Sequence, residues 1–143
     1  MVPIVKPRRE AHGMDEHPNV AIVKRACKAA RKGERALAAE LFADDAELYV
    51  PGKNLLAGLY EGREAVFDFY DKAKELSGGT LKAYLHDVVA NAHHAFAIEN
   101  FMATRDGRNL DSRDVTIFHV IDGRVAGGTR LYTEIDVHDE FWS

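Results

Sequence analysis

The chain has 143 residues, with 46% apolar and 29% charged side chains and a formal net charge of −4. This balance is typical of one globular domain, and it argues against a nucleic-acid-binding surface or a surface for anionic membranes. No apolar run has the length of a membrane span, and the first residues lack an apolar signal core, so we expect a cytoplasmic protein.

Residues 1–16 contain two prolines and mixed charge without periodicity, which predicts a flexible tail before a single domain at 17–143. A helix is predicted over 18–32, because proline suits a first helical turn and Gly33 suits its end. The only cysteine, Cys27, lies on the alanine-rich face of this helix. It excludes an internal disulfide, suits a reducing compartment, and is interpreted as a small core residue.

A second, short helix is predicted over 34–42 and a strand over 46–50, followed by a loop or short edge strand over 53–60. The segment 63–76 has the clearest helical period, with apolar residues spaced i, i+3, i+4 and i+7. Four strands follow at 81–90, 95–105, 108–121 and 124–136. Asp-Gly dipeptides at 106–107 and 122–123 are strong hairpin signals, because both residues accept a positive φ.

Helices followed by one long antiparallel meander bury their apolar faces by packing helices on a sheet, which predicts an α+β fold with a pocket. The strand at 108–121 is apolar on both faces. The helices can cover one face, and we expect a second copy of the chain to cover the other, giving a homodimer.

Several segments in order resemble the SnoaL-like group of the nuclear transport factor 2 superfamily: 41–46 (LFADDA), 51–52 (PG), 58–66 (GLYEGREAV), 86–91 (HDVVAN), 122–125 (DGRV) and 139–143 (DEFWS). The resemblance implies a cone-shaped α+β barrel, with three N-terminal helices on a curved antiparallel sheet. It also implies dimers through that sheet and a small-molecule ligand. It implies no single activity, because this fold hosts ketosteroid isomerases, polyketide cyclases, scytalone dehydratases and limonene epoxide hydrolases.

The catalytic groups of these relatives are mostly replaced in this chain. Val50 and Thr116 stand where an isomerase has its base and its oxyanion-stabilising acid. Glu99 and Phe101 stand where an epoxide hydrolase has its Arg and Asp, and Arg130 stands near the acid of the cyclases. His86 lies near the histidine of the dehydratases.

The register of the last hairpin decides which side chains face the pocket. A two-residue turn places Arg130 opposite Val115, whereas a three-residue loop places it opposite Asp114 and places Tyr132 opposite Ser112. We favour the second, because opposite charges across strands attract. The predicted inner face then carries Asp114, Thr116, Phe118, Gly128, Arg130 and Tyr132. Because side chains alternate between the two faces of a strand, the same argument places four further residues on the inner face: Tyr84, His86, Asn100 and Met102.

We expect an Asp114–Arg130 pair that either bridges two strands structurally or binds an anionic oxygen through the guanidinium. In the catalytic interpretation His86 or Asp114 moves a proton, and Arg130 or Tyr132 stabilises an oxyanion. Further ligand contacts are predicted from Tyr49, Tyr84, Asn100, Met102, Thr116, Phe118 and Trp142.

No spacing of His, Cys and carboxylates predicts a metal, and no motif predicts a cofactor. The favoured function is a cofactor-independent isomerase, cyclase or dehydratase acting on a compact apolar carbonyl or polyol compound. The alternative is a non-catalytic ligand-binding or accessory protein of the same fold.

Overall fold

The computed structural model describes residues 16–143, so the predicted tail lies outside the described residues except for Glu16. α1 (Pro18–Lys32) begins at a proline, with the His17 ring accepting a hydrogen bond from the Asn19 N–H, and it ends at Gly33 with φ of 71°. α2 (Arg35–Leu41) and α3 (Arg63–Leu76) follow. These helices confirm the three predicted ones, with the second shorter at both ends.

The strands described are β1 (Phe42–Val50), β2 (Gly58–Glu61), β3 (Lys82–Ala90), β4 (His94–Arg105), β5 (Arg108–Ile121) and β6 (Arg124–Leu131). They form one six-stranded sheet in the order β2-β1-β6-β5-β4-β3. Every neighbouring pair is antiparallel except β1 and β6, which run parallel. The α+β prediction is confirmed, with one correction: the sheet is mixed, because β1 joins the meander at its far edge.

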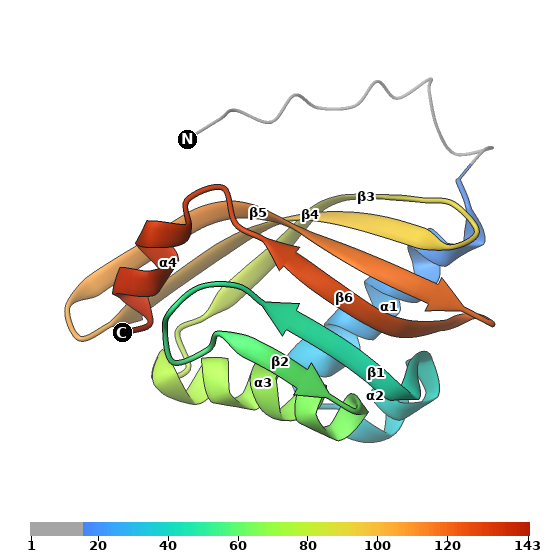
Figure 1. Ribbon diagram of the computed structural model, residues 1–143, viewed down its shortest axis with the longest axis horizontal. Helices are drawn as coiled ribbons and strands as arrows, with labels where there is room; N and C mark the ends of the chain where they lie inside the picture. The colour runs from blue at the N-terminus through green and yellow to red at the C-terminus, as the bar shows by residue number, and fades with distance from the viewer. Residues whose placement is uncertain (1–15) are drawn as a thin grey trace.

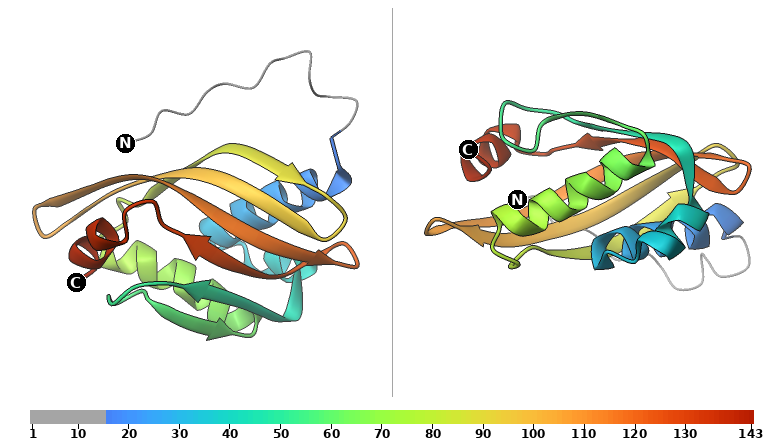
Figure 2. Two further views of the ribbon diagram at one scale, coloured as in Figure 1. Left: turned by 45° about the horizontal axis from the view of Figure 1, so that its top comes forward. Right: turned by 90° about the horizontal axis from the view of Figure 1, so that it is seen from below.

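The sheet is curved and not closed, and α1, α2 and α3 cover its concave face (Figures 1 and 2). A fourth helix, α4 (Ile135–Phe141), lies at the end of the sheet where β6 finishes. The predicted strand over 124–136 therefore stops at Leu131. No helix among residues 16–143 has the length and apolarity needed to cross a membrane.

Both Asp-Gly hairpins are present, with Asp106, Gly107, Asp122 and Gly123 at φ between 49° and 75°. The predicted register of the second hairpin is wrong. Its turn has two residues, and a bulge between His119 and Val120 then shifts the pairing, so that Arg130 lies opposite Thr116. Because of the bulge, the side chains of this part of β6 point to the faces of the sheet that we predicted. The Arg130 side chain is therefore buried on the concave face.

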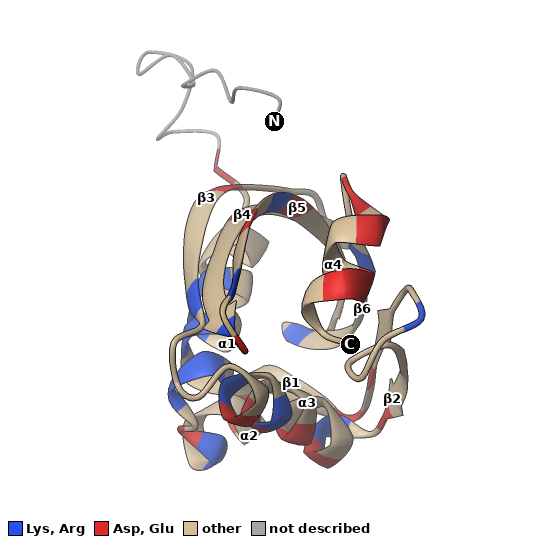
Figure 3. Cartoon of the chain, turned by 90° about the vertical axis from the view of Figure 1, so that its left-hand side faces the viewer, with Lys and Arg blue, Asp and Glu red and all other residues tan. Residues whose placement is uncertain are grey.

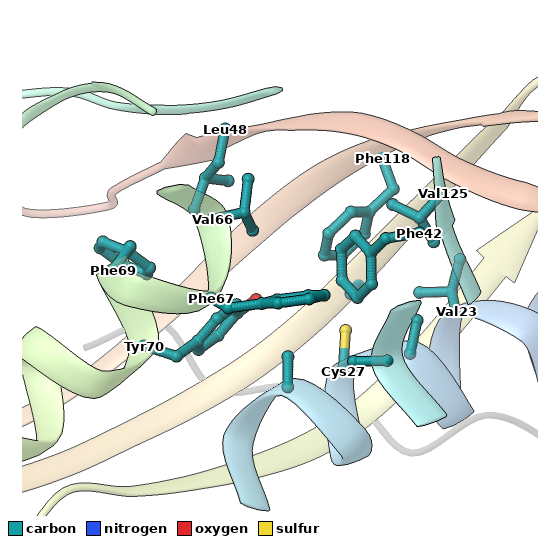
Figure 4. Close-up of a cluster of buried hydrophobic side chains, with 14 of the residues drawn as sticks. Val23, Cys27, Phe42, Leu48, Val66, Phe67, Phe69, Tyr70, Phe118 and Val125 are labelled. Atoms are coloured by element: carbon teal, nitrogen blue, oxygen red, sulfur yellow. The ribbon is translucent and has the colours of Figure 1, made fainter. Parts of the chain in front are cut away.

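The core fills the space between the sheet and α1 and α3, where Cys27 packs among aromatic rings (Figure 4). Phe42 and Phe67 meet edge to face at 5.4 Å. Gly128 leaves room for the ring of Phe118, because a Cβ at position 128 would lie only 3.0 Å from that ring. Figure 3 views the molecule along the sheet from the end that carries α4, and shows Lys and Arg positions on α1 and acidic positions on α4.

Candidate active site

A cavity of about 380 Å³ lies between the concave face of the sheet, α1, α3 and α4. Its apolar wall comprises Leu56, Phe69, Ala73, Leu81, Ala83, Phe101, Leu110 and Trp142. Tyr70, Arg130, Tyr132 and His138 bring polar groups to this apolar wall, and Arg31, Tyr84 and four exposed lysines also line the cavity. An apolar enclosure on which polar groups converge is the usual arrangement of a small-molecule site.

The central feature is a buried pair between Asp114 on β5 and His138 on α4. Asp114 Oδ2 and His138 Nε2 lie 2.9 Å apart, and both residues are 2% exposed. Asp114 also accepts a hydrogen bond from Ser112 Oγ at 2.7 Å and from the Thr133 N–H at 3.0 Å. Burial raises the pKa of Asp114, but the bonds from His138, Ser112 and Thr133 outweigh it and leave the pKa below its ordinary value.

An ionised Asp114 fixes the tautomer of its partner. The carboxylate can only accept, so His138 Nε2 carries a proton and donates it to Oδ2. His138 Nδ1 is buried and has no hydrogen-bond partner among residues 16–143. In the neutral imidazole that nitrogen holds a free lone pair, which is the requirement for a general base.

Tyr132 covers one face of this imidazole. The two rings stack with centroids 3.6 Å apart and planes 10° apart. Burial raises the pKa of Tyr132, and the nearby Arg130 only partly opposes it. The phenol therefore stays protonated at neutral pH and can act as a hydrogen-bond donor in the cavity.

Arg130 brings a buried cation to the same cavity. Its guanidinium lies 5.2 Å from the centre of the Phe69 ring and 4.7 Å from that of Phe101, so two π faces stabilise the charge. Its Nε is buried without a partner among the described residues. Burial also raises the pKa of Tyr70, despite the hydrogen bond that Arg130 gives it. Arg130 thus places a cation with one buried, unpaired donor beside the cavity.

A second buried carboxylate, Glu99, is neutralised differently. It is 1% exposed, forms an ion pair with Arg31 of α1, and accepts a hydrogen bond from Thr116 at 3.3 Å. Arg31 lines the cavity, whereas Glu99 lies behind it. This pair supports the contact between α1 and the sheet.

Contacts from two loops hold α4 in position. Asp139 accepts hydrogen bonds from the Lys53 N–H and from Asn54 Nδ2, each at 2.8 Å. The Leu55 N–H donates to the Trp142 carbonyl at 3.1 Å. On the other side, Arg105 donates to the Ser143 carbonyl at 2.9 Å. These contacts fix the helix that carries His138.

The structure brings some of the predicted site residues together. Arg130, Tyr132 and Trp142 line the cavity, and Asp114 contacts it through His138. The predicted Asp114–Arg130 pair is corrected: Asp114 binds His138, and Arg130 lies across from Thr116. Thr116 is buried beside Glu99.

Tyr84 lines the rim of the cavity, whereas the other predicted site residues lie elsewhere. His86 is exposed at a bulge in β3. Asn100 and Met102 lie on the convex face, because β4 turns Glu99 and Phe101 inward. Tyr84 pairs with Asn100 and is 54% exposed at the cavity rim, Tyr49 is 47% exposed on the convex side, and Phe118 is in the core.

Two buried residues of the site, Glu99 and His138, were not predicted, although the sequence contained a signal for each. Applied to the first hairpin, the two-residue rule pairs Arg105 with Arg108 and carries Glu99 to a position opposite Asp114, which is the observed register. His138, Phe141 and Trp142 have the i, i+3, i+4 spacing of a helix face and are all buried. Residues 16–143 contain no group of three His, Cys, Asp or Glu side chains that could hold a metal ion.

Comparisons with known proteins agree with this architecture. Bal32a, from a soil-derived mobile gene cassette, superimposes with a TM-score of 0.82 and 32% identity over 87% of this chain and 96% of its own. A putative SnoaL-like polyketide cyclase from Jannaschia sp. CCS1 gives a TM-score of 0.73 at 20% identity, over 92% of this chain and 99% of its own. The uncharacterized protein Rv0034 of Mycobacterium tuberculosis is 29% identical over 91% of this chain and 100% of its own.

TerC, which was co-crystallized with polyporic acid, has a TM-score of 0.74 at 15% identity over 89% of this chain and all of its own. At such identities the likeness concerns the fold. The model of the SnoaL-like domain matches residues 23–127, most of the chain. The chain therefore belongs to the SnoaL-like domain family, which confirms the resemblance seen in its sequence.

Proposed function

We propose that this protein is a cofactor-independent acid/base enzyme of the isomerase, cyclase or dehydratase type, acting on a compact apolar carbonyl compound. The observation that carries the proposal is the buried His138–Asp114 pair, in which His138 borders the cavity and keeps Nδ1 without a partner. A pair of this kind in an otherwise apolar cavity serves proton transfer better than it serves stability.

In the proposed mechanism, His138 Nδ1 removes a proton from a carbon next to the substrate carbonyl. Asp114 holds the ring through Nε2 and stabilises the imidazolium that forms. Negative charge develops on the carbonyl oxygen, where Arg130 and the Tyr132 hydroxyl act as donors. Return of the proton from His138 to another carbon completes an isomerisation. If His138 instead protonates a β-hydroxyl, the C–O bond breaks and water leaves in a dehydration; if the enolate carbon attacks a second carbonyl of the substrate, the new alkoxide takes the His138 proton and the ring closes.

Members of the family support this chemistry by analogy. The Jannaschia neighbour is a putative polyketide cyclase, and TerC was co-crystallized with polyporic acid. Here His138 takes the role that the sequence assigned to His86, and Asp114 supports it instead of pairing with Arg130.

Hydrogen–deuterium exchange tests the proposal without knowledge of the natural substrate. The α-protons of 2-tetralone, a compact apolar ketone, are followed by NMR in D₂O with catalytic amounts of protein. We expect exchange above the buffer rate, and a loss of about 10²–10⁴-fold in His138→Gln, the range for a positioned base. His93→Gln, which changes an exposed histidine at a turn, is the matched control and should match the parent protein.

A different result would favour the alternative function. If tetralone shifts the single tryptophan indole resonance, so that it occupies the cavity, yet exchange stays at the buffer rate, the protein is a non-catalytic binding protein. Equal rates in His138→Gln and the parent protein would also remove the proposed base.

We further propose that the convex face of the sheet joins two copies of the chain. Phe96, Met102, Ile121 and Leu131 are 42% to 61% exposed on the convex side of β4, β5 and β6. Exposed apolar residues in this number are typical of an interface. Light scattering at micromolar concentration should report a dimer, and Phe96→Asp with Leu131→Asp should give a monomer; a monomeric parent protein would end this proposal.

A further inference from the structure

The opening of the cavity has a charge opposite to that of the protein. Four lysines line it, Lys28 and Lys32 on α1, Lys74 on α3 and Lys82 at the start of β3. All four are exposed, and no aspartate or glutamate is among the residues that line the cavity. The chain as a whole carries a formal charge of −4, so this concentration of cations is local.

The four lysines have no carboxylate partners. None of them forms an ion pair within residues 16–143, whereas Arg31, which also lines the cavity, is neutralised by Glu99. α1 and α3 both end at this opening, and lysines in a last turn stabilise a helix C-terminus. Lys82 lies on a strand and has no such role. Clustered cations around one opening raise the local concentration of anions.

The interior beyond the lysines is apolar. Phe69, Phe101 and Trp142 line it, and the buried Arg130 lies between the first two rings. Resting on the function proposed above, we infer that the substrate is an amphiphilic anion, an apolar ring system with a carboxylate or phosphate at one end. The apolar part occupies the cavity beside His138, and the anionic group stays at the opening among Lys28, Lys32, Lys74 and Lys82.

Three naphthalene probes of one shape test this inference: 2-naphthoate, 2-naphthyl phosphate and the neutral 2-acetylnaphthalene. Trp142 is the only tryptophan and lines the cavity, so its single indole N–H resonance reports occupancy. We expect at least one anion to shift this resonance with an affinity about tenfold above that of the ketone, and to lose this advantage in 0.5 M NaCl, because salt screens exposed charges. The anion that binds more tightly identifies the headgroup.

The variant that carries the four changes Lys28→Gln, Lys32→Gln, Lys74→Gln and Lys82→Gln should lose most of the anion affinity and keep that for 2-acetylnaphthalene. Lys24→Gln with Lys72→Gln changes two exposed lysines of the same helices that do not line the cavity, and should alter neither affinity.

Three outcomes would overturn the inference. The parent protein could bind the anions and the ketone with equal affinity, or neither anion could shift the indole resonance. The two lysine variants could also lose equal amounts of anion affinity. These outcomes are independent of proton exchange. The binding experiments use the parent protein and the lysine variants alone, so a failed proposal about catalysis and a failed proposal about the anion remain distinguishable.

Discussion

Glu99 and Asp114 lie directly opposite each other on β4 and β5, both buried on the concave face, yet their environments differ in kind. Glu99 pairs with Arg31, whose guanidinium can donate hydrogen bonds but cannot accept them. Asp114 pairs with His138, an imidazole whose second nitrogen has no partner among the described residues.

The difference separates a pair with a structural role from the pair to which we assign the proposed proton transfer. Two adjacent carboxylates repel each other unless each has its own positive or hydrogen-bonding partner. Arg31 comes from α1 and His138 from α4, so the first and the last helix each supply the partner of one carboxylate: an ion pair for Glu99 and a hydrogen bond for Asp114. Four experiments test this contrast.

Arg31→Leu should have the largest effect on stability. Removing one partner of a buried ion pair leaves Glu99 uncompensated, and we expect a loss of about 3 kcal/mol in the free energy of unfolding. Urea denaturation measures it. Arg31→Leu combined with Glu99→Leu should recover most of that loss, because an apolar pair carries no desolvation cost. A change below about 1 kcal/mol in the single variant would contradict a structural role.

Asp114→Asn should lower the free energy of unfolding by about 2 kcal/mol, less than Arg31→Leu, because the amide keeps the shape of the carboxylate but loses the charge-assisted hydrogen bonds. The pKa of Asp114 is lower in the folded protein than in the unfolded chain. Its stabilising effect is therefore complete above the ordinary value of 3.8 and is lost as the pH falls through the lower folded value. The stability difference between parent and variant should shrink in that acidic window, and a difference that grew there would contradict the assignment.

Ser112→Ala removes one of the bonds that hold Asp114, and should cost about 1 kcal/mol. The bonds from His138 and the Thr133 N–H remain, so the variant should fold and keep the exchange activity proposed above in weakened form. Ser77→Ala removes the bonds of another buried serine, to Lys74 and Leu81, and should lower stability without weakening the exchange activity. An unchanged free energy of unfolding in Ser112→Ala would show that Ser112 does not support Asp114.

Asp139→Ala should have the smallest and most local effect. It removes the contacts from Lys53 and Asn54 to α4, and should speed hydrogen exchange of α4 amides while leaving those of α1 unchanged. Asp139→Asn keeps an acceptor oxygen and should exchange like the parent protein. Faster exchange in both helices would mean that α4 is not held independently of the Glu99–Arg31 pair.

The fold was predictable because its signals are local and repeated. The helix period at 63–76 and the two Asp-Gly turns each act over a few residues, and the structure confirms them. The bulge after His119 was not predictable, because a single extra residue in a strand depends on sheet curvature and not on nearby sequence. The two-residue turn and that bulge together place Arg130 two positions from its predicted partner on β5, opposite Thr116 in place of Asp114, and so keep it on the predicted face.

The candidate site was harder to predict than the fold. α4 has only seven residues, lacks a side-chain cap, and begins with alternating Ile135 and Val137, which is a strand pattern. His138 was therefore not recognised as buried. The inward position of Asp114 and Arg130 follows from the alternation of side chains along a strand. The partner of Asp114 comes from α4, and the rings that contact Arg130 come from α3 and β4. Contacts between residues so far apart in the chain cannot be predicted from a local sequence pattern.

The residues that line the cavity come from two separate parts of the chain, and this separation affects how such proteins can diversify. The lysines come from residues 28–82, whereas Asp114, Arg130, Tyr132 and His138 all follow the turn between β3 and β4. A genetic exchange at that turn would transfer one half intact. The lysines at the opening and the His138–Asp114 pair can therefore change independently in evolution, each without replacement of the other.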